Sequence, residues 1–483
     1  MAENFNPRNV RPPAVAGAFY EADPDALSGQ IDDLLAAADV QPQPHFMPIV
    51  LAPHAGHVYS GPVAARAYNA VAELPFSTVI VAGVAHRVAV PGAALYASGA
   101  FATPLGPLAV DEDMAQSLLA ASPLFKHLPR AHEGEHSIEV QLPFIQRLRR
   151  KGLKILPVLL NNPSSDILRQ IGLALGGELK KGGALLVLSS DLSHFPADAL
   201  ARRADASVLR ALGIAVERKN PDYFMQAEDL LVSRGEDGLD TVCCGAAAVT
   251  AGIHAALALG AAGFQVLDYA TSADQSGEAK RVVGYGAGIF SSRPVKNGGF
   301  SLLPAEKKEL LALARNSIER HLGGEKPQHP PLSKNTMFNV PAAAFVTLHK
   351  NGGLRGCIGS LEARQLLQDA VCGLALSSAF EDPRFPPLEK AELKACDIEI
   401  SVLSPLERVP DASAIRPGVH GVLVRRGRQG GTYLPQVWEN FGAKEAFLDS
   451  LCEEKAGLPA EAWRDGSAEL YIYTADVFGE KGR

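Results

Sequence analysis

The sequence predicts an α/β domain with a mainly parallel sheet flanked by helices, followed by a smaller α+β domain. The observations behind this prediction are the chain length of 483 residues, an alternation of apolar runs and helix-like segments before residue 291, and a different pattern after residue 300. Hydrophobic residues make up 47% of the chain and charged residues 20%, as in globular proteins. A chain of this length exceeds what one hydrophobic core usually holds, so two domains are expected.

Four apolar runs of strand length stand out in the first domain. They are FMPIVLAP (46–53), STVIVAGV (77–84), LKILPVLL (153–160) and GGALLVLSS (182–190). Their apolar residues are continuous rather than alternating, which indicates strands covered on both faces, as in a parallel sheet. The segments GPVAARAYNAVAEL (61–74) and SSDILRQIGLALGGELKK (164–181) have the spacing of the helices that would cover them.

The domain boundary is predicted from a change in composition. The apolar stretch from residue 285 runs into Ser, Pro, Lys, Asn and Gly before residue 300, and an amphipathic helix is expected over 302–322. We therefore predict a first domain over 1–291, a linker over 292–299 and a second domain over 300–483. In the second domain, 343–361 and 418–437 resemble hairpins, 363–380 a helix and 396–409 a half-buried strand.

Charge and cysteine usage exclude several classes of function. The net charge is −7 and no long Lys/Arg block is present, so neither nucleic acid nor an anionic membrane is expected as a partner. The longest apolar stretch, 243–264, is rich in Ala and Gly and is expected to be a buried helix rather than a membrane span. All 6 cysteines follow residue 242 without a CxxC pair, which indicates a reducing cytoplasm.

Polar side chains follow three of the four predicted strands. His54 and His57 come after the first run, His86 after the second, and Asp191 with His194 after the fourth. Ligands of open α/β sheets bind outside the carboxyl ends of the strands, so these side chains are expected to converge on one crevice. Each histidine taken alone is as readily a hydrogen-bonded residue at a strand end. His57 in particular either lines the crevice or caps the following helix.

The stretch EHSIEVQLPF (135–144) adds two further candidates for the crevice, His136 and Glu139. We expect them in the first turn of a helix, where the i and i+3 positions share one face. They either enter the same crevice or form a capping arrangement without a role in chemistry.

The adjacent cysteines of DTVCCGAAAV (240–249) are expected in the first turn of a helix over about 242–260. There the helix dipole favours a thiolate. Adjacent helical residues point about 100° apart, so one of Cys243 and Cys244 is expected to be a ligand or nucleophile and the other a core residue. Two imidazoles with a carboxylate suit ferrous iron, and a thiolate in its place also admits zinc or copper.

At these residues the first domain resembles the Memo family, whose fold is related to the class III extradiol ring-cleaving dioxygenases. The shared motifs are RPPAVAGAFY, LAPHAGHVYSGPVAARAY, EHSIEVQLPF, SSDLSHF and the Cys-Gly of TVCCG, over about 10–291. The resemblance implies that His54, His86 and Cys244 bind the metal, and that Asp191 and His194 occupy the place of the acid/base histidine of those dioxygenases. In those enzymes a carboxylate fills the position of Cys244.

This resemblance implies a centre of non-haem Fe(II), with copper or zinc as alternatives. Two functions follow from it: a dioxygenase-like enzyme, or a non-catalytic protein that binds iron or copper for assembly. The sequence departs from the family pattern in three places. His57 replaces an aromatic residue, and GVAHR replaces a turn of the Gly-Pro-Ser/Asn-His type. The residues after Cys244-Gly245 lack the basic residue and the proline often found there.

The second domain resembles the AMMECR family over about 300–480, through LRGCIG, DPRFPPL and GVHGV. The resemblance implies a site around Arg355, Cys357, Arg384 and His420. Cys357 is a nucleophile if His420 lies near it; otherwise it is a small buried side chain between glycines that serve the backbone.

Proteins of the two families resemble companions of a radical S-adenosylmethionine protein. The resemblance therefore implies such a protein as the partner, while the small-molecule substrate remains open.

Overall fold

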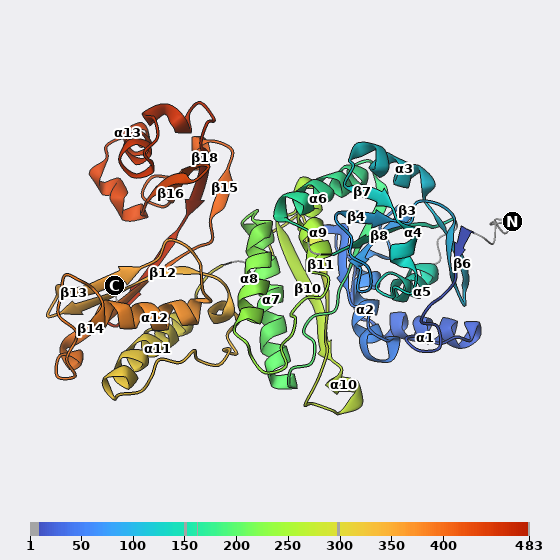
Figure 1. The fold of residues 1–483 in the computed structure, drawn as a ribbon, viewed down its shortest axis with the longest axis horizontal. Coiled ribbons are helices and arrows are strands. Elements are labelled where there is room, and N and C mark those ends of the chain that lie inside the picture. Colours follow the sequence, from blue (N-terminus) through green and yellow to red (C-terminus); the bar gives the residue numbers. More distant parts are fainter. Residues whose placement is uncertain (1–8, 149–151, 162, 297–299, 482–483) are drawn as a thin grey trace. The chain divides into compact units, whose positions relative to one another are not determined.

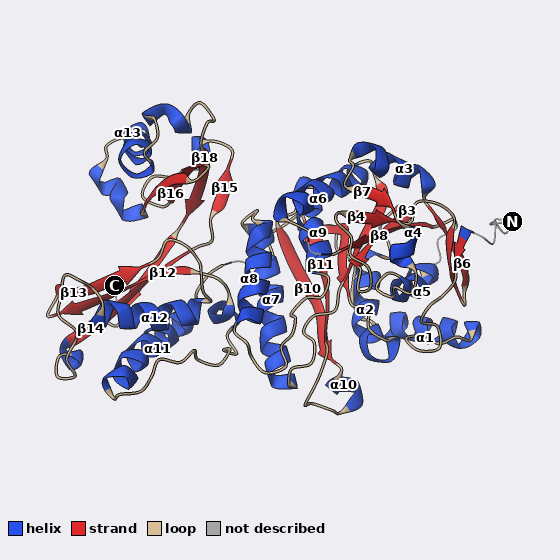
Figure 2. Cartoon of the chain, viewed as in Figure 1, coloured by secondary structure: helices blue, strands red, loops and turns tan. Residues whose placement is uncertain are grey.

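The structure is a computed structural model that describes residues 9–148, 152–161, 163–296 and 300–481 (Figures 1 and 2). The chain divides into two compact units. The first unit comprises Met1–Glu217 and Phe224–Gly299, and the second comprises Arg218–Tyr223 and Phe300–Arg483. Residues 297–299 of the predicted linker lie outside the described residues.

The first unit is built on one sheet of 11 strands, ordered β1-β5-β6-β8-β3-β9-β2-β11-β10, with β4 bridging β7 and β8. The strands are β1 (Val10–Arg11), β2 (Phe46–Ala52), β3 (Phe76–Val84), β4 (Ala93–Leu95), β5 (Ala100–Thr103), β6 (Gly106–Val110), β7 (Phe125–His127), β8 (Lys154–Leu160), β9 (Gly183–Ser189), β10 (Gly263–Thr271) and β11 (Gly284–Ser291).

The four predicted strands form the centre of this sheet. They are β8, β3, β9 and β2, they are neighbours in that order, and all three pairings are parallel. Their side chains are almost completely buried: the last six residues of β8 and the last six of β9 are all buried. The prediction of a mainly parallel sheet is confirmed, and antiparallel pairs occur at its margins, where β11 joins β10 and β2.

Helices cover the sheet (Figure 1). Those before residue 300 are α1 (Pro24–Ala37), α2 (His57–Val71), α3 (Glu112–Ala121), α4 (Pro129–His132), the 3-10 turn η2 (Glu139–Gln141), α5 (Leu142–Arg147), α6 (Ser165–Lys180), α7 (Asp198–Glu217), α8 (Pro221–Ser233), α9 (Ala246–Ala258) and α10 (Ala273–Ser276).

The Ala/Gly-rich stretch is the buried helix α9, packed closely on α6. A Cβ at Gly172 of α6 would lie 2.3 Å from the carbonyl oxygen of Ala251, so the two backbones approach closely only because this residue is glycine. Among the described residues, no helix is long and apolar enough to cross a membrane. The expected start of this helix at about 242 is wrong: α9 begins at Ala246, and both cysteines lie in the turn before it.

The second unit contains two antiparallel sheets of 4 strands each, ordered β13-β12-β14-β19 and β15-β18-β16-β17. Its elements are α11 (Pro304–Leu322), η3 (Thr336–Asn339), β12 (Ala343–Lys350), β13 (Gly353–Gly359), α12 (Leu367–Phe380), η4 (Leu393–Ala395), β14 (Cys396–Leu403), β15 (Glu407–Val409), η5 (Ala412–Ala414), β16 (Gly421–Arg426), β17 (Gln429–Tyr433), η6 (Pro435–Asn440), α13 (Lys444–Ser450), the π-helical turn η7 (Leu451–Ala456), η8 (Ala460–Trp463), β18 (Glu469–Tyr473) and β19 (Ala475–Gly479).

In this unit α11 and α12 pack together, and α12 lies against β12 and β13 (Figure 2), which is the α+β arrangement of helices beside an antiparallel sheet. The two predicted hairpins are β12–β13 and β16–β17, and the predicted helices are α11 and α12.

Candidate metal centre

Three histidines from three separate segments meet in the first unit. The nitrogen donors of His54, His86 and His136 all lie within 4.8 Å of one another. The rings of His86 and His136 are stacked with centroids 4.8 Å apart, and the His54 ring meets both edge-on at 5.5 and 5.4 Å. Imidazole nitrogens bind divalent ions at about 2.0–2.1 Å, so small side-chain adjustments bring this group onto one ion.

The sheet explains how two of these side chains meet. His54 and His86 directly follow the carboxyl ends of β2 and β3, which run parallel with β9 between them. The expectation that strand ends deliver histidine to one edge is met by this pair. His136 comes from the turn before η2, and of the two open interpretations of this residue the structure supports entry into the crevice.

Cys244 lies beside His54 but outside the compact group of three histidines found among the described residues. Its Sγ is 3.3 Å from His54 Nε2, and its backbone N–H donates to the carbonyl oxygen of Asp191 at 3.2 Å. Desolvation and the charge of Asp191 raise the pKa of this thiol well above its usual value. The helix dipole expected to act on this thiol does not reach it as predicted, because Cys244 precedes the first residue of α9 and lies beside the Asp191 carboxylate.

Cys243 belongs to the core, as one of the two cysteines was expected to. It is 3% exposed, its Sγ is 3.2 Å from Ser190 Oγ, and burial raises the pKa of its thiol to about 12. Such a thiol is neutral at pH 7 and inert.

The imidazoles of His54 and His136 are held in the neutral form that binds metals. Burial, and then the charge of His86, lower the pKa of His54 to about 3. Burial and the charge of His54 lower the pKa of His136 to about 4. Since a protonated ring nitrogen cannot coordinate a metal ion, neutral rings at pH 7 suit the centre to a divalent cation.

Glu135 is a residue of the centre that the sequence prediction missed. Its carboxylate accepts from the backbone N–H of His86 at 2.7 Å and from His86 Nδ1 at 2.9 Å. Burial disfavours its charged form, but the hydrogen bonds from His86 and Ser137 outweigh this and lower its pKa to about 2. The signal that could have found it is a carboxylate directly before His136 in EGEH.

Asp191 and His194 lie at the same centre. Asp191 Oδ1 accepts from the backbone N–H of His54 at 2.7 Å and of Ala55 at 3.2 Å, and its Oδ2 is 4.0 Å from His54 Nε2. His194 is half-buried, and burial lowers its pKa while the charge of Asp191 raises it. Its Nε2 is buried and has no hydrogen-bond partner among the described residues.

Two predicted crevice residues serve the structure instead. His57 is 1% exposed, donates from Nε2 to the carbonyl oxygen of Val140 at 2.9 Å, and packs against Tyr20 and Phe144. Glu139 is fully buried in an ion pair with Arg11. Of the two interpretations left open for each residue, the structure supports the one without a role in the crevice, because His57 and Glu139 turn toward the core and the N-terminal segment.

The site implied for the second unit is not assembled as predicted. Both ring nitrogens of His420 are engaged by Arg416, through its backbone N–H at 3.1 Å and its guanidinium at 3.3 Å. Arg355 donates to the Pro386 carbonyl at 2.9 Å and to Glu392 at 3.0 Å. Among the described residues the hydrogen-bond partners of His420 and of Cys357 are other groups, which favours the alternative of a packing thiol for Cys357.

Cys357 has different neighbours. It accepts at Sγ from the hydroxyl of Thr347 at 3.2 Å, while its backbone N–H donates to Asp382 at 2.8 Å. Arg384 donates to the Cys357 carbonyl at 3.1 Å and to Asp382. A Cβ at the preceding Gly356 would lie 2.1 Å from the carbonyl oxygen of Ser378, so this glycine serves close packing of α12 on β13.

This arrangement predicts that Cys357 reacts without a histidine base. In the His420→Ala protein, alkylation of Cys357 by iodoacetamide at pH 7.5 is expected to proceed within about twofold of the unchanged rate, since Arg416 holds that ring. Peptide mass spectrometry over a time course measures the rate, and Cys357→Ser gives the blank. A drop of tenfold or more in the variant would restore His420 as the activating base.

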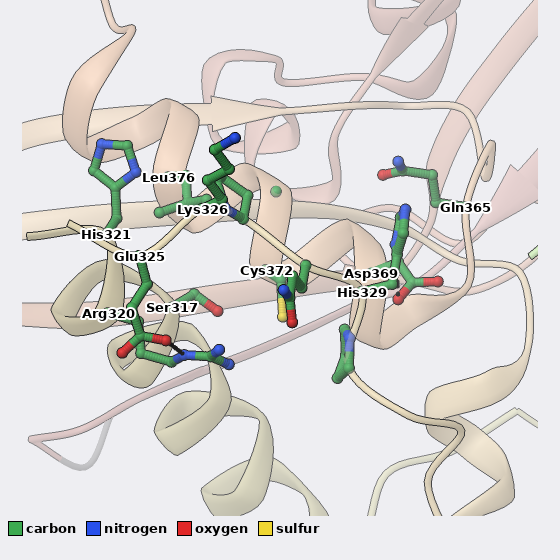
Figure 3. A pocket seen from close by; sticks show the side chains of 14 residues that line it. Ser317, Arg320, His321, Glu325, Lys326, His329, Gln365, Asp369, Cys372 and Leu376 are labelled. Atoms are coloured by element: carbon green, nitrogen blue, oxygen red, sulfur yellow. Dashed lines mark hydrogen bonds and ion pairs between the residues drawn. The ribbon is translucent and has the colours of Figure 1, made fainter. Parts of the chain in front are cut away.

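The second unit also holds a cavity of about 160 Å³ between α11, the loop after it and α12 (Figure 3). Asp369, 3.4 Å from His329, and Cys372 line it. Cys372 is half-buried, whereas Cys396 and Cys452 are buried.

The fold and the centre define a class: an α/β protein with a three-histidine candidate metal centre at the carboxyl edge of a mainly parallel sheet. The family model described as Memo-like protein matches residues 11–289, and the AMMECR1 model matches residues 311–478. The chain belongs to the Memo family, and it carries an AMMECR1 domain in addition.

Individual relatives agree with this division of the chain. A MEMO1 family protein of Aquifex aeolicus is 34% identical over 284 residues, which are 58% of this chain and 99% of that protein. A MEMO1 family protein of Caldivirga maquilingensis is 34% identical over 291 residues, with the same shares. A protein of Methanothermobacter thermautotrophicus is 41% identical over 184 residues, 37% of this chain and 95% of that one.

Among solved structures, an uncharacterized protein from Pyrococcus horikoshii is 34% identical and covers 36% of this chain and 92% of its own. The TM-score of this match is 0.31, too low to support a statement about the fold.

Proposed function

We propose that the first unit binds a divalent metal ion, Fe(II) in the cell, through His54, His86 and His136, with Cys244 as an additional donor beside His54. The observation that carries this proposal is the convergence of three imidazole donors within 4.8 Å. Imidazole suits iron, copper and zinc alike, and a thiolate strengthens copper and zinc binding. Iron is proposed among them because of the resemblance to the extradiol dioxygenases.

The test is a metal titration under anaerobic conditions. The chelator-stripped full-length chain is titrated with Fe(II), Cu(I) and Zn(II) in competition with a chromophoric chelator, and bound metal is counted by elemental analysis. One Fe(II) per chain is expected, and none in the His54→Ala/His86→Ala double variant. A wild-type chain that binds none of the three ions, or a double variant that binds as well as wild type, contradicts the proposal.

We further propose that the centre is enzymatic rather than a store, and His194 supports this choice. A bound redox-active ion would supply electron transfer and activation of a small molecule at an open position. Metal storage needs no proton donor, yet His194 holds an unpartnered, buried Nε2 at the centre among the described residues. Asp191 lies within its electrostatic reach, as expected for a group that moves a proton.

A metabolite screen for metal-dependent oxygen consumption tests the enzymatic proposal. Once a substrate is found, His194→Ala is expected to keep its metal and to lose turnover by about 10²–10⁴-fold, the usual contribution of general acid–base catalysis. Equal turnover would remove the proposed role of His194. No metal-dependent consumption across the screen would favour the alternative, a non-catalytic iron- or copper-binding assembly protein.

The proposed partner is a radical S-adenosylmethionine protein, and this proposal rests on the family resemblance of both units. Co-elution of the two purified proteins on size-exclusion chromatography tests it. Independent elution at concentrations of tens of micromolar would count against a stable complex.

A further inference from the structure

The ring of His54 is fixed by a buried hydroxyl. His54 Nδ1 lies 3.0 Å from Ser189 Oγ, and Ser189 Oγ lies 2.5 Å from the carbonyl oxygen of Ser137. A carbonyl oxygen cannot donate, so the single hydroxyl hydrogen of Ser189 must point at Ser137. Ser189 is then an acceptor for His54, and Nδ1 of His54 must carry the ring proton.

Gln141 fills the remaining lone pair of Ser189. Its Nε2 donates to Ser189 Oγ at 2.9 Å and to the carbonyl oxygen of Pro53 at 2.8 Å, and its Oε1 accepts from the Tyr68 hydroxyl at 2.7 Å. A flipped amide would bring oxygen against the Pro53 carbonyl, so the orientation is determined. Ser189 is fully buried, and its hydroxyl hydrogen and both lone pairs are used by Ser137, Gln141 and His54, so the neutral His54 ring has one tautomer.

The opposite ring atom of His54 faces the metal centre. With the proton on Nδ1, Nε2 carries a lone pair, and the Cys244 thiol, whose Sγ lies 3.3 Å away, can donate to it. A thiol donating to an imidazole lone pair matches this assignment.

The Glu135 carboxylate fixes the ring of His86 in the same way, through its Nδ1 atom. Glu135 Oε1 lies 2.9 Å from His86 Nδ1 and also accepts from the backbone N–H groups of His136 at 2.8 Å and Ser137 at 2.9 Å. Three backbone N–H donors, those of His86, His136 and Ser137, point at this carboxylate, so it stays ionised and can only accept. Nδ1 of His86 therefore donates, which selects the tautomer of the neutral ring that has its lone pair on Nε2.

We propose that Ser189 and Glu135 are positioning residues that fix the tautomers of His54 and His86, so that both rings present Nε2 to the metal ion. The two networks share one segment, residues 135–141. It supplies Glu135 for His86, the Ser137 carbonyl and Gln141 for Ser189, and the third imidazole, His136. The segment 135–141 therefore contributes to the placement of all three histidine rings.

The segment 135–141 is also held against the end of β3 by direct contacts. The Ser137 hydroxyl donates to the Val84 carbonyl at 2.8 Å, and a Cβ at Gly83 would lie 2.7 Å from Ser137 Oγ. The end of β3 therefore holds the segment at a distance that only glycine at 83 allows.

The tautomers are tested on the metal-free full-length chain with ¹⁵N-labelled histidine, by long-range ¹⁵N–¹H NMR with assignment by His54→Gln and His86→Gln. In wild type, Nδ1 of both residues is expected to be protonated and Nε2 unprotonated. Ser189→Ala is expected to give His54 a mixture of tautomers without changing His86, and Glu135→Gln the reverse. Thr250→Ala, which removes another buried hydroxyl of this unit, is the matched control.

The effect on metal binding rests on the proposed function and is measured separately, by anaerobic Fe(II) titration. Each variant is expected to lose about 10–100-fold in affinity, the usual effect of removing the partner of a ligating histidine. Protonated Nε2 in wild type, or unchanged tautomers in both variants, would overturn the inference. If the tautomers are as stated but wild type binds no metal, the inference about positioning holds and the proposed function fails.

Discussion

Replacing His136 by alanine is expected to lower the Fe(II) affinity of the first unit by about 10–100-fold or more, since a ligand contributes at least as much as an outer partner. His54→Ala and His86→Ala are expected to cost more still. The physical reason is that the His136 nitrogen lies within 4.8 Å of the donors of both other histidines. Anaerobic chelator competition measures all three affinities.

The His136→Ala variant distinguishes between two possible sets of metal ligands. The family resemblance implies His54, His86 and Cys244 without His136, whereas the geometry adds His136 and leaves Cys244 beside His54. Cys244→Ala, measured in parallel, reports the contribution of the thiol. His127→Ala, which removes an exposed imidazole at the end of β7, is the control and should bind as wild type. An unchanged affinity for His136→Ala would restrict the ligands to those implied by the resemblance.

Replacing Glu139 by alanine is expected to destabilise the first unit by about 3–5 kcal/mol, the cost of breaking a buried ion pair by removing one partner. The change leaves the Arg11 guanidinium buried at 4% exposure without its carboxylate. It also removes the acceptor for the backbone N–H groups of Ala14 and Val15 at 2.8–2.9 Å and for the Tyr20 hydroxyl at 2.6 Å.

Urea unfolding of the full chain distinguishes the two units in this experiment. Both tryptophans, Trp438 and Trp463, belong to the second unit, so their fluorescence is expected to show an unchanged transition. Far-UV circular dichroism is expected to show an earlier transition of the first unit. Glu133→Ala, which removes an exposed carboxylate at the end of α4, is the control. A loss below about 1 kcal/mol would mean that Arg11 finds another partner.

The central sheet could be predicted because its signal is local. Mostly apolar runs of strand length identify β2, β3, β8 and β9 without reference to the rest of the chain. The marginal strands β4 to β7 are short, three to five residues each, and carry no such signal. Pairing with their neighbours makes them strands.

The cysteine doublet shows where a local rule fails. The helix pattern after Cys244 is clear in sequence, but its first residue is decided by the turn, in which the Cys244 N–H bonds Asp191 rather than starting a helix. The pKa of the Cys244 thiol is consequently raised by burial and by the Asp191 carboxylate, instead of being lowered by a helix dipole.

By itself the sequence determined that His54 and His86 stand at the carboxyl ends of buried parallel strands, because strand length and chain direction follow from the apolar runs. Only the tertiary structure decided between His136 and Glu139. They are three residues apart, yet one meets the other histidines while the other is paired with Arg11, 128 residues away in the chain. The choice depends on which side chains the folded N-terminal segment brings into reach, and such contacts between distant residues leave no local pattern.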